Sequence, residues 1–293
     1  ERYMNDASGR PLMTGMLNFP LYGALQSVMA RGRPTAELAE RIETMMRLHK
    51  RPHLMPSFVD NHDVDRFLAG GSSTALKQAL LAIMTLPGIP VIYYGTEQSF
   101  NVQRAAMFKD GFQSGGFDRF DTEAPLYQYV RRLTALRRDH RTLSRGSPVI
   151  LKRDEAGAGA LVYRQRDGKD TLLVAFNTAE QEKLAANIET GLPAGTRLEP
   201  LFAIAGNAPD LRILARGRLH LRLPARAGYV WRIAGDAPTA MRSASAPTIR
   251  RVTTVSADGK TRVEGTADAN RPFKLVLDGG LAEAVEVTPG SDG

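Results

Sequence analysis

Apolar residues recur at two different spacings along the chain, and the change of spacing divides it. Up to about residue 145, segments with apolar positions three or four residues apart alternate with short apolar runs, a pattern typical of helices alternating with parallel strands. Residues 1–145 are therefore predicted to belong to an α/β unit. The predicted helices are 35–50, 74–86 and 125–139, and the apolar runs are 54–59 and 90–94.

The next part of the chain has short β-type runs instead of helical segments. Turns rich in Gly, Asp and Pro separate these runs between residues 146 and 235, which predicts an antiparallel β-sandwich. Residues 236–247, rich in Ala, Pro and Ser, are typical of a linker. The predicted sandwich strands are 148–151, 160–164, 171–176, 218–223 and 228–233.

Residues 248–293 are predicted to begin a further β-rich module. The expected strands are 249–255, 261–264 and 273–277, with a turn at Asp258-Gly259 between the first two. A piece of fewer than about 50 residues without Cys is too small for a stable core of its own. We therefore expect it to be only part of a domain.

The two apolar runs of the first part end in groups that could carry chemistry. The helix between them, 74–86, predicts a βαβ unit whose two strands end at the same edge. A lone Asp-Asn-His-Asp run is often only a turn or a helix cap, so the second polar strand end is what favours a site. The first run continues into Asp60-Asn61-His62-Asp63, within FVDNHD, and the second into Gly95-Thr96-Glu97, within GIPVIYYGTEQ.

These two motifs resemble the seventh-strand and eighth-strand motifs of the α-amylase family, glycoside hydrolase family 13. Residues 13–25, which include TGMLNFPLYGAL, are similar to that family's sixth strand and the segment after it. The resemblance covers about residues 1–235 and implies part of a (β/α)₈ TIM barrel, strands 6 to 8, followed by the family's β-sandwich domain. It also implies hydrolysis of α-1,4-glucosidic bonds in starch or malto-oligosaccharides, with retention of configuration.

The resemblance implies a role for each residue of the candidate site. Asp63 matches the third catalytic carboxylate, which stabilises the transition state, and His62 matches a sugar-binding histidine. Asn61 and Arg104 are expected to contact substrate, the latter because Gln103-Arg104-Ala-Ala-Met-Phe108 is similar to a segment near the family's cleft. Supporting positions are expected at Asp60, Arg66 and Glu97, with Arg66 paired to a carboxylate.

The family's nucleophile and acid lie on its fourth and fifth strands, before the region of resemblance. A retaining mechanism needs those two carboxyl groups about 5 Å apart, and Glu1 does not match the family's acid. We therefore expect a C-terminal portion of an enzyme, inactive when expressed alone. No metal or other cofactor is expected in this chain, and the family's structural calcium is expected in the upstream half.

Other functions remain open at this point. An α-glucan transglycosylase uses the same barrel and carboxylates, and a catalytically silent homologue would only bind polysaccharide or a partner protein. His62-Asp63 also matches the metal-binding doublet of HD-type phosphohydrolases. The strand-like run before it, with Pro56, disfavours that all-helical class.

Charge and composition change this interpretation little. A net charge of +8 raises nucleic acid as a partner, but the arginines are scattered, and Arg131-Arg132 and Arg137-Arg138 fit the solvated face of one helix. No apolar run reaches the roughly 18 residues of a membrane span. We expect an α-glucan partner, no nucleic acid and no membrane, and secretion or periplasmic export because the substrate is a polymer. The oligomeric state is not indicated.

Overall fold

The computed structural model describes residues 12–234, the single residues 4, 6, 8 and 10, and the strand segments 248–253, 262–266, 273–275 and 285–287. The chain divides into two compact units, residues 1–241 and 242–293. None of the helices among the described residues has the length and hydrophobicity of a membrane span.

The first unit begins with helices around a pair of parallel strands. Strand β1 (Pro56–Phe58) pairs with β2 (Ile89–Val91), and α3 (Ser73–Thr85) connects them, as the predicted βαβ unit requires. Ser72 caps α3 by accepting a hydrogen bond from the Ala75 amide, at 3.1 Å. The other helical elements are α1 (Phe19–Leu25), η1 (Gln26–Ala30), α2 (Thr35–Leu48), η2 (Pro52–Leu54), η3 (Phe67–Ala69), α4 (Pro125–Asp139) and α5 (Thr142–Arg145).

The strand expected within residues 13–25 is not formed. Residues 12–18 have no strand assignment, and α1 occupies the rest of the segment. The segment does reach β1, because the Asn18 amide donates to the Pro56 carbonyl at 2.8 Å. Pro56 has no N–H to donate in return, so a ladder of hydrogen bonds cannot continue there. Two of the three expected barrel strands are therefore present as strands.

Two antiparallel sheets follow the helices. A six-stranded sheet has the order β3-β4-β5-β10-β7-β8, and β6 pairs with β9 in a second sheet. The antiparallel sandwich is confirmed in outline, with β6, β7 and β8 unpredicted. The bounds are β3 (Ser147–Lys152), β4 (Ala160–Asp167), β5 (Asp170–Asn177), β6 (Lys183–Glu189), β7 (Arg197–Ala203), β8 (Leu211–Arg212), η4 (Ala215–Gly217), β9 (Arg218–Leu223) and β10 (Gly228–Ile233).

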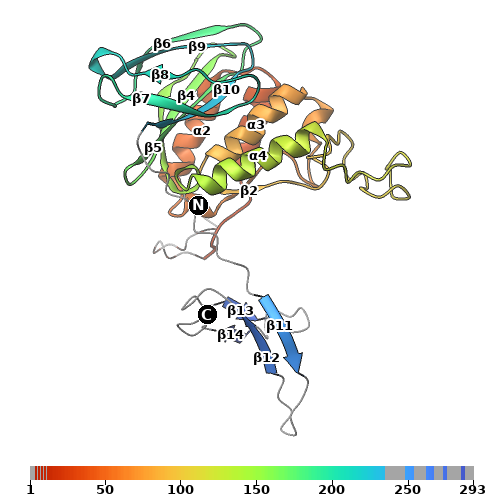
Figure 1. Ribbon diagram of the computed structural model, residues 1–293. Coiled ribbons are helices and arrows are strands. Elements are labelled where there is room, and N and C mark those ends of the chain that lie inside the picture. The colour runs from red at the N-terminus through yellow and green to blue at the C-terminus, as the bar shows by residue number, and fades with distance from the viewer. Residues whose placement is uncertain are drawn as a thin grey trace. The chain divides into compact units, whose positions relative to one another are not determined.

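The six-stranded sheet is apolar on both faces, and each face has its own core. One face packs on the helices through Tyr163, Val174 and Val230, and the other packs on β6 and β9 through residues such as Trp231. Figure 1 shows α2, α3 and α4 on one side of this sheet and the β6–β9 pair on the other. This first core contains helix residues that precede residue 146 and strand residues that follow it. The domain boundary expected at residue 146 stays a prediction.

The second unit contains two antiparallel strand pairs among its described residues. β11 (Thr248–Thr253) pairs with β12 (Arg262–Thr266), and β13 (Phe273–Leu275) pairs with β14 (Val285–Val287). The first three agree with the predicted strands apart from their ends, and β14 was not predicted. The expected linker, 236–247, and the Asp258-Gly259 turn lie outside the described residues.

Candidate functional site

The carboxyl ends of β1 and β2 meet at one edge of the first unit. The two strands are parallel and in register, with Phe58 opposite Val91, so both chains leave the pair in the same direction. β1 continues through the buried Val59 into residues 60–63, and β2 continues through Tyr93 and Tyr94 into residues 95–97. This parallel pairing brings the two predicted motifs together.

Asp60 joins the two strand ends from inside the protein. Its side chain is 1% exposed, and its Oδ1 accepts a hydrogen bond from the Thr96 hydroxyl at 2.7 Å. Its Oδ2 accepts from the Phe67 amide at 3.1 Å. Burial raises the pKa of Asp60, while these two hydrogen bonds and the charge of Arg66 act in the opposite direction. Asp60 thus links the two strand ends, and its expected supporting role stays a prediction.

Arg66 is the second buried charge at this edge, and it is also 1% exposed. Its Nη1 donates to the Thr96 hydroxyl at 3.4 Å, so it reaches Asp60 through Thr96 instead of through the expected direct pairing with a carboxylate. Its guanidinium carbon lies 4.2 Å from the Tyr93 ring centroid and 5.4 Å from that of Phe100. Stacking on aromatic rings suits the weakly hydrated guanidinium, which explains how the charge is accommodated.

His62 and Asp63 are the exposed members of the group. Their side chains are 61% and 54% exposed, and His62 Nε2 lies 3.3 Å from Asp63 Oδ1. Asn61 is buried, and its Oδ1 accepts a hydrogen bond from the Asp63 amide at 2.8 Å, which fixes the turn that presents both side chains. The substrate contacts expected of His62, Asp63 and Asn61 stay predictions.

Arg104 lies beside this turn and supports its backbone. Its Nε donates to the His62 carbonyl at 2.9 Å, and Gln103 donates to the same carbonyl at 3.2 Å. Arg104 itself has a φ of +59°, an unusual conformation for a side chain of this size. Glu97 is half-buried just after Thr96, and its expected supporting role stays a prediction.

Three residues of this group, Thr96, Tyr93 and Gln103, lie within the quoted motifs but were not predicted as site residues. Thr96 is 1% exposed and lies between Asp60 and Arg66. Tyr93 lies between His62 and Arg66, with ring centroids 6.4 Å apart for His62 and Tyr93, and burial raises the pKa of Tyr93 to about 12. These contacts, like that of Gln103, join side chains at least 27 residues apart along the chain.

A cavity of about 510 Å³ opens beside Asp63, a volume in the usual range for small-molecule sites. It is polar: Asp63 and Asp65 line it together with Tyr22, Gln26 and Arg31. Among the described residues, no three or more His, Asp or Glu side chains gather as a metal site would need. The calcium that the resemblance implies stays an expectation.

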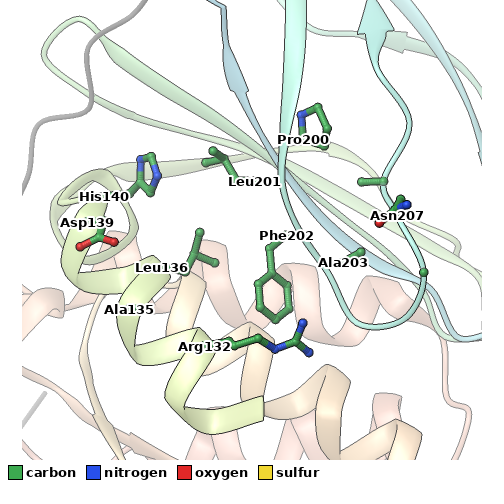
Figure 2. A pocket seen from close by; sticks show the side chains of 12 residues that line it. Arg132, Ala135, Leu136, Asp139, His140, Pro200, Leu201, Phe202, Ala203 and Asn207 are labelled. Atoms are coloured by element: carbon green, nitrogen blue, oxygen red, sulfur yellow. The ribbon is translucent and has the colours of Figure 1, made fainter. Parts of the chain in front are cut away.

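A second cavity, of about 560 Å³, lies between α4 and β7 and is separate in its lining from the Asp63 group. Figure 2 shows Arg132 and Leu136 of α4 around the same space as Phe202 of β7. Arg132 covers the Phe202 ring, with its guanidinium carbon 5.3 Å from the centroid. The ring face is therefore already occupied, and none of the residues with expected roles lines this cavity.

Comparisons with known proteins point to one group of enzymes. The chain is 27% identical over 209 residues to a cyclomaltodextrin glucanotransferase of Thermoanaerobacterium thermosulfurigenes, covering 70% of this chain and 28% of the relative. It is 29% identical over 155 residues to an α-amylase of Niallia circulans, covering 52% of this chain and 28% of the relative. No protein-family model matches the chain.

A similar fold is found among solved structures. An α-amylase from Geobacillus thermoleovorans, solved with acarbose, superimposes with a TM-score of 0.62 at 24% identity, covering 76% of this chain and 49% of that one. At this identity the likeness shows the fold alone. The chain spans 28% of the length of both curated relatives named above.

Proposed function

The chain is homologous to the α-amylase family, glycoside hydrolase family 13, and from that premise we propose that it belongs to an enzyme that hydrolyses α-1,4-glucosidic bonds in starch or malto-oligosaccharides with retention of configuration. The observation that carries the proposal is the placement of Asp63. Its carboxylate is exposed at the edge where two parallel strands end, which is the face that bears the active site in barrels of this kind.

In this proposal Asp63 acts on the transition state. Cleavage of a glycosidic bond passes through an oxocarbenium-like state, and hydrogen bonds to ring hydroxyls that tighten in that state lower the barrier. The exposed Asp63 carboxylate can accept such bonds from the sugar. His62, with Nε2 3.3 Å from Asp63, can donate to a neighbouring hydroxyl without transferring a proton in the reaction.

The buried residues behind Asp63 give the site its rigidity. Asp60, Thr96 and Arg66 link the two strand ends. The Asn61 side chain fixes the turn that presents His62 and Asp63, because it accepts a hydrogen bond from the Asp63 amide. A preorganised site stabilises a transition state better than a mobile one, because no energy is spent on ordering it during the reaction. We therefore assign these residues to positioning and not to direct contact with the scissile bond.

A retaining mechanism also needs a nucleophile and an acid, with carboxyl groups about 5 Å apart. Asp60 suits neither role, since both of its oxygens accept hydrogen bonds inside the protein. Asp63 is already assigned to the sugar hydroxyls. We therefore expect the 293-residue chain, expressed alone, to hydrolyse no α-glucan. A polymeric substrate also fits secretion or periplasmic export of the enzyme.

The second candidate is transglycosylation of α-glucans, supported by the similarity to cyclomaltodextrin glucanotransferases. The same carboxylates would serve, and only the acceptor would differ, a sugar hydroxyl in place of water. Products separate the two: hydrolysis releases a new reducing end at each cleavage, whereas transfer yields cyclic or lengthened glucans without one. A homologue that only binds polysaccharide would give neither product.

The proposal is tested by Asp63→Asn in the active enzyme, by which we mean a protein that contains this chain together with the nucleophile and the acid. We expect kcat on starch to fall at least ~10²-fold, the scale of losing one preorganised transition-state contact, with folding intact. Asp210→Asn is the matched control, because that exposed aspartate lies near Arg197 in the sheet region, away from the site. Near-normal turnover of the Asp63 variant would remove Asp63 from the reaction.

A further inference from the structure

The loop that precedes α4 exposes four phenylalanine rings. We call residues 107–121 the aromatic loop, and in Figure 1 it projects beyond the N-terminal end of α4. Exposed large apolar side chains gathered in one place are characteristic of binding surfaces. The four rings, with their exposed fractions, are Phe108 (66%), Phe112 (67%), Phe117 (65%) and Phe120 (54%).

The aromatic loop is held in shape by its own hydrogen bonds. The Arg119 amide donates to the Met107 carbonyl at 2.7 Å, which joins the two sides of the loop. The Lys109 amide donates to the Asp118 carboxylate at 2.9 Å, which adds a second link between the same sides. These hydrogen bonds give the loop a defined backbone conformation, from which the four rings project.

The base of the aromatic loop is continuous with the candidate site. Gln98, next to Glu97, donates to the Asp121 carbonyl at 2.9 Å, and its oxygen accepts from the Asp121 amide at 3.3 Å. At the other end of the loop, Arg104 holds the His62 carbonyl at 2.9 Å. The aromatic loop is therefore anchored to the segments that carry the candidate site.

The chemistry of the aromatic loop suits a sugar polymer. Apart from Met107, its large apolar side chains are phenylalanines, and polar residues such as Lys109, Asp118 and Arg119 separate them. The flat face of an aromatic ring can pack against the C–H groups of a glucose face. Neighbouring charged and amide groups can bond the hydroxyls at its rim. Aliphatic side chains supply the apolar area but no flat face.

We propose that the aromatic loop is an α-glucan-binding surface that holds a polymeric chain beyond the sugars at the cleavage point. This inference rests on the proposed function and deepens it, because it assigns a polymer and not a short malto-oligosaccharide as the preferred substrate. Phe112 and Phe117 are the rings to test. The Arg119 guanidinium carbon lies 5.5 Å from the Phe117 centroid on one face of that ring, and Phe117 is still 65% exposed. Phe108 and Phe120 pack edge-to-face on each other at 5.1 Å and also support the loop.

The experiment is affinity electrophoresis of the complete 293-residue chain in native gels that contain soluble starch, with dextran gels as the reference. Replacing Phe112 and Phe117 together by Ser should weaken starch binding at least about tenfold, since two ring contacts are lost. The control replaces Leu184 and Leu214 by Ser, because these side chains are 57% and 46% exposed on other elements. The control should bind starch like the unchanged chain.

A conservative series separates ring stacking from general apolar contact. Tyr at positions 112 and 117 keeps a flat ring and should retain starch binding, whereas Leu keeps apolar area without the ring and should lose it. Retention by the Leu pair, or unchanged binding by the Ser pair, overturns the proposal. So does loss of self-association by the Ser pair with starch binding unchanged, which would make the surface an interface between copies.

The binding result is independent of the test of the proposed function. Asp63→Asn leaves the rings in place, so starch binding by that variant should still depend on Phe112 and Phe117. If turnover survives Asp63→Asn while binding depends on the rings, the catalytic assignment fails and the surface stands. If turnover is lost but the rings do not affect binding, the surface fails and the catalytic assignment stands.

Discussion

Arg137 is predicted to be one of the main stabilising residues of the first unit, and Arg137→Met measures its contribution. The side chain is 9% exposed, so the solvated position expected for Arg137 on its helix is wrong. It bonds main-chain carbonyl groups only. Burial lowers its pKa to about 10, which still leaves the guanidinium charged at neutral pH. Its hydrogen bonds join the end of α3, the segment leading into β2, and α5: they go to Met84 (2.6 Å), Leu86 (3.0 Å), Leu143 (2.9 Å) and Gly88 (2.6 Å).

The size of the effect follows from these four carbonyls. Each buried acceptor left without a partner costs about 1–3 kcal/mol, or about 4–12 kcal/mol for all four. The apolar Met side chain does not carry the desolvation cost of the buried charge, which offsets about 3–5 kcal/mol of this loss. The midpoints of these two ranges, about 8 and about 4 kcal/mol, leave an expected net loss of about 4 kcal/mol in the free energy of unfolding. Arg137→Lys keeps the charge and has three hydrogen-bond donors, so it should lower the free energy of unfolding less than Arg137→Met does.

Urea unfolding monitored by tryptophan fluorescence provides the assay. The chain has one Trp, Trp231, which is fully buried in β10 and therefore reports on the first unit. Arg138→Met is the matched control, because that neighbour on α4 is 61% exposed and pairs only with Asp139 among the described residues. The control should change stability by less than about 0.5 kcal/mol. A loss below about 1 kcal/mol for Arg137→Met would refute the reasoning.

Three further predictions concern the candidate site. His62→Ala should weaken substrate binding yet keep measurable turnover in the active enzyme, and a greater loss of kcat than for Asp63→Asn would reverse the two roles. Arg66→Met should lower the free energy of unfolding by about 2–4 kcal/mol, because Asp60 would lose its buried counter-charge; a denaturation midpoint equal to the unchanged chain's would contradict this. Since burial raises the pKa of Asp60 above 3.8, the folded state binds its proton more tightly than the unfolded state, and stability should fall as pH rises between those two pKa values. Asp60→Asn should flatten this part of the stability curve, and an unchanged slope would exclude Asp60 as its source.

The parts of the fold that were predicted well have strong local patterns. The strands β9 and β10 and the helix α4 have the expected bounds, because β9 alternates apolar and polar residues, β10 is a short apolar run, and α4 repeats apolar residues at helical spacing. β6 was missed because its pairing with β9 shifts between Ala185 and Ile188, which breaks the alternation. β7 contains Pro200, a residue that argues against a strand when only the sequence is known.

The candidate site shows a similar division between local and distant information. The positions of Asp60 to Asp63 came from a motif within one segment, and so did the turn that they form. The role of Thr96 could not be predicted, since it depends on two strand ends meeting across 36 residues of chain. For Arg66, sequence reasoning expected a direct ion pair, whereas the structure supplies aromatic rings and a hydroxyl.

The central claim, that Asp63 stabilises the transition state of glycoside cleavage, is tested most directly by comparing two affinities in the active enzyme. One ligand is maltotriose, and the other is an inhibitor that imitates the oxocarbenium-like state. A group that acts on the transition state contributes more to binding the second than the first. Asp63→Asn should therefore weaken inhibitor binding at least about tenfold more than maltotriose binding. Equal weakening of both ligands would show that Asp63 only binds the sugar, and would contradict the catalytic role.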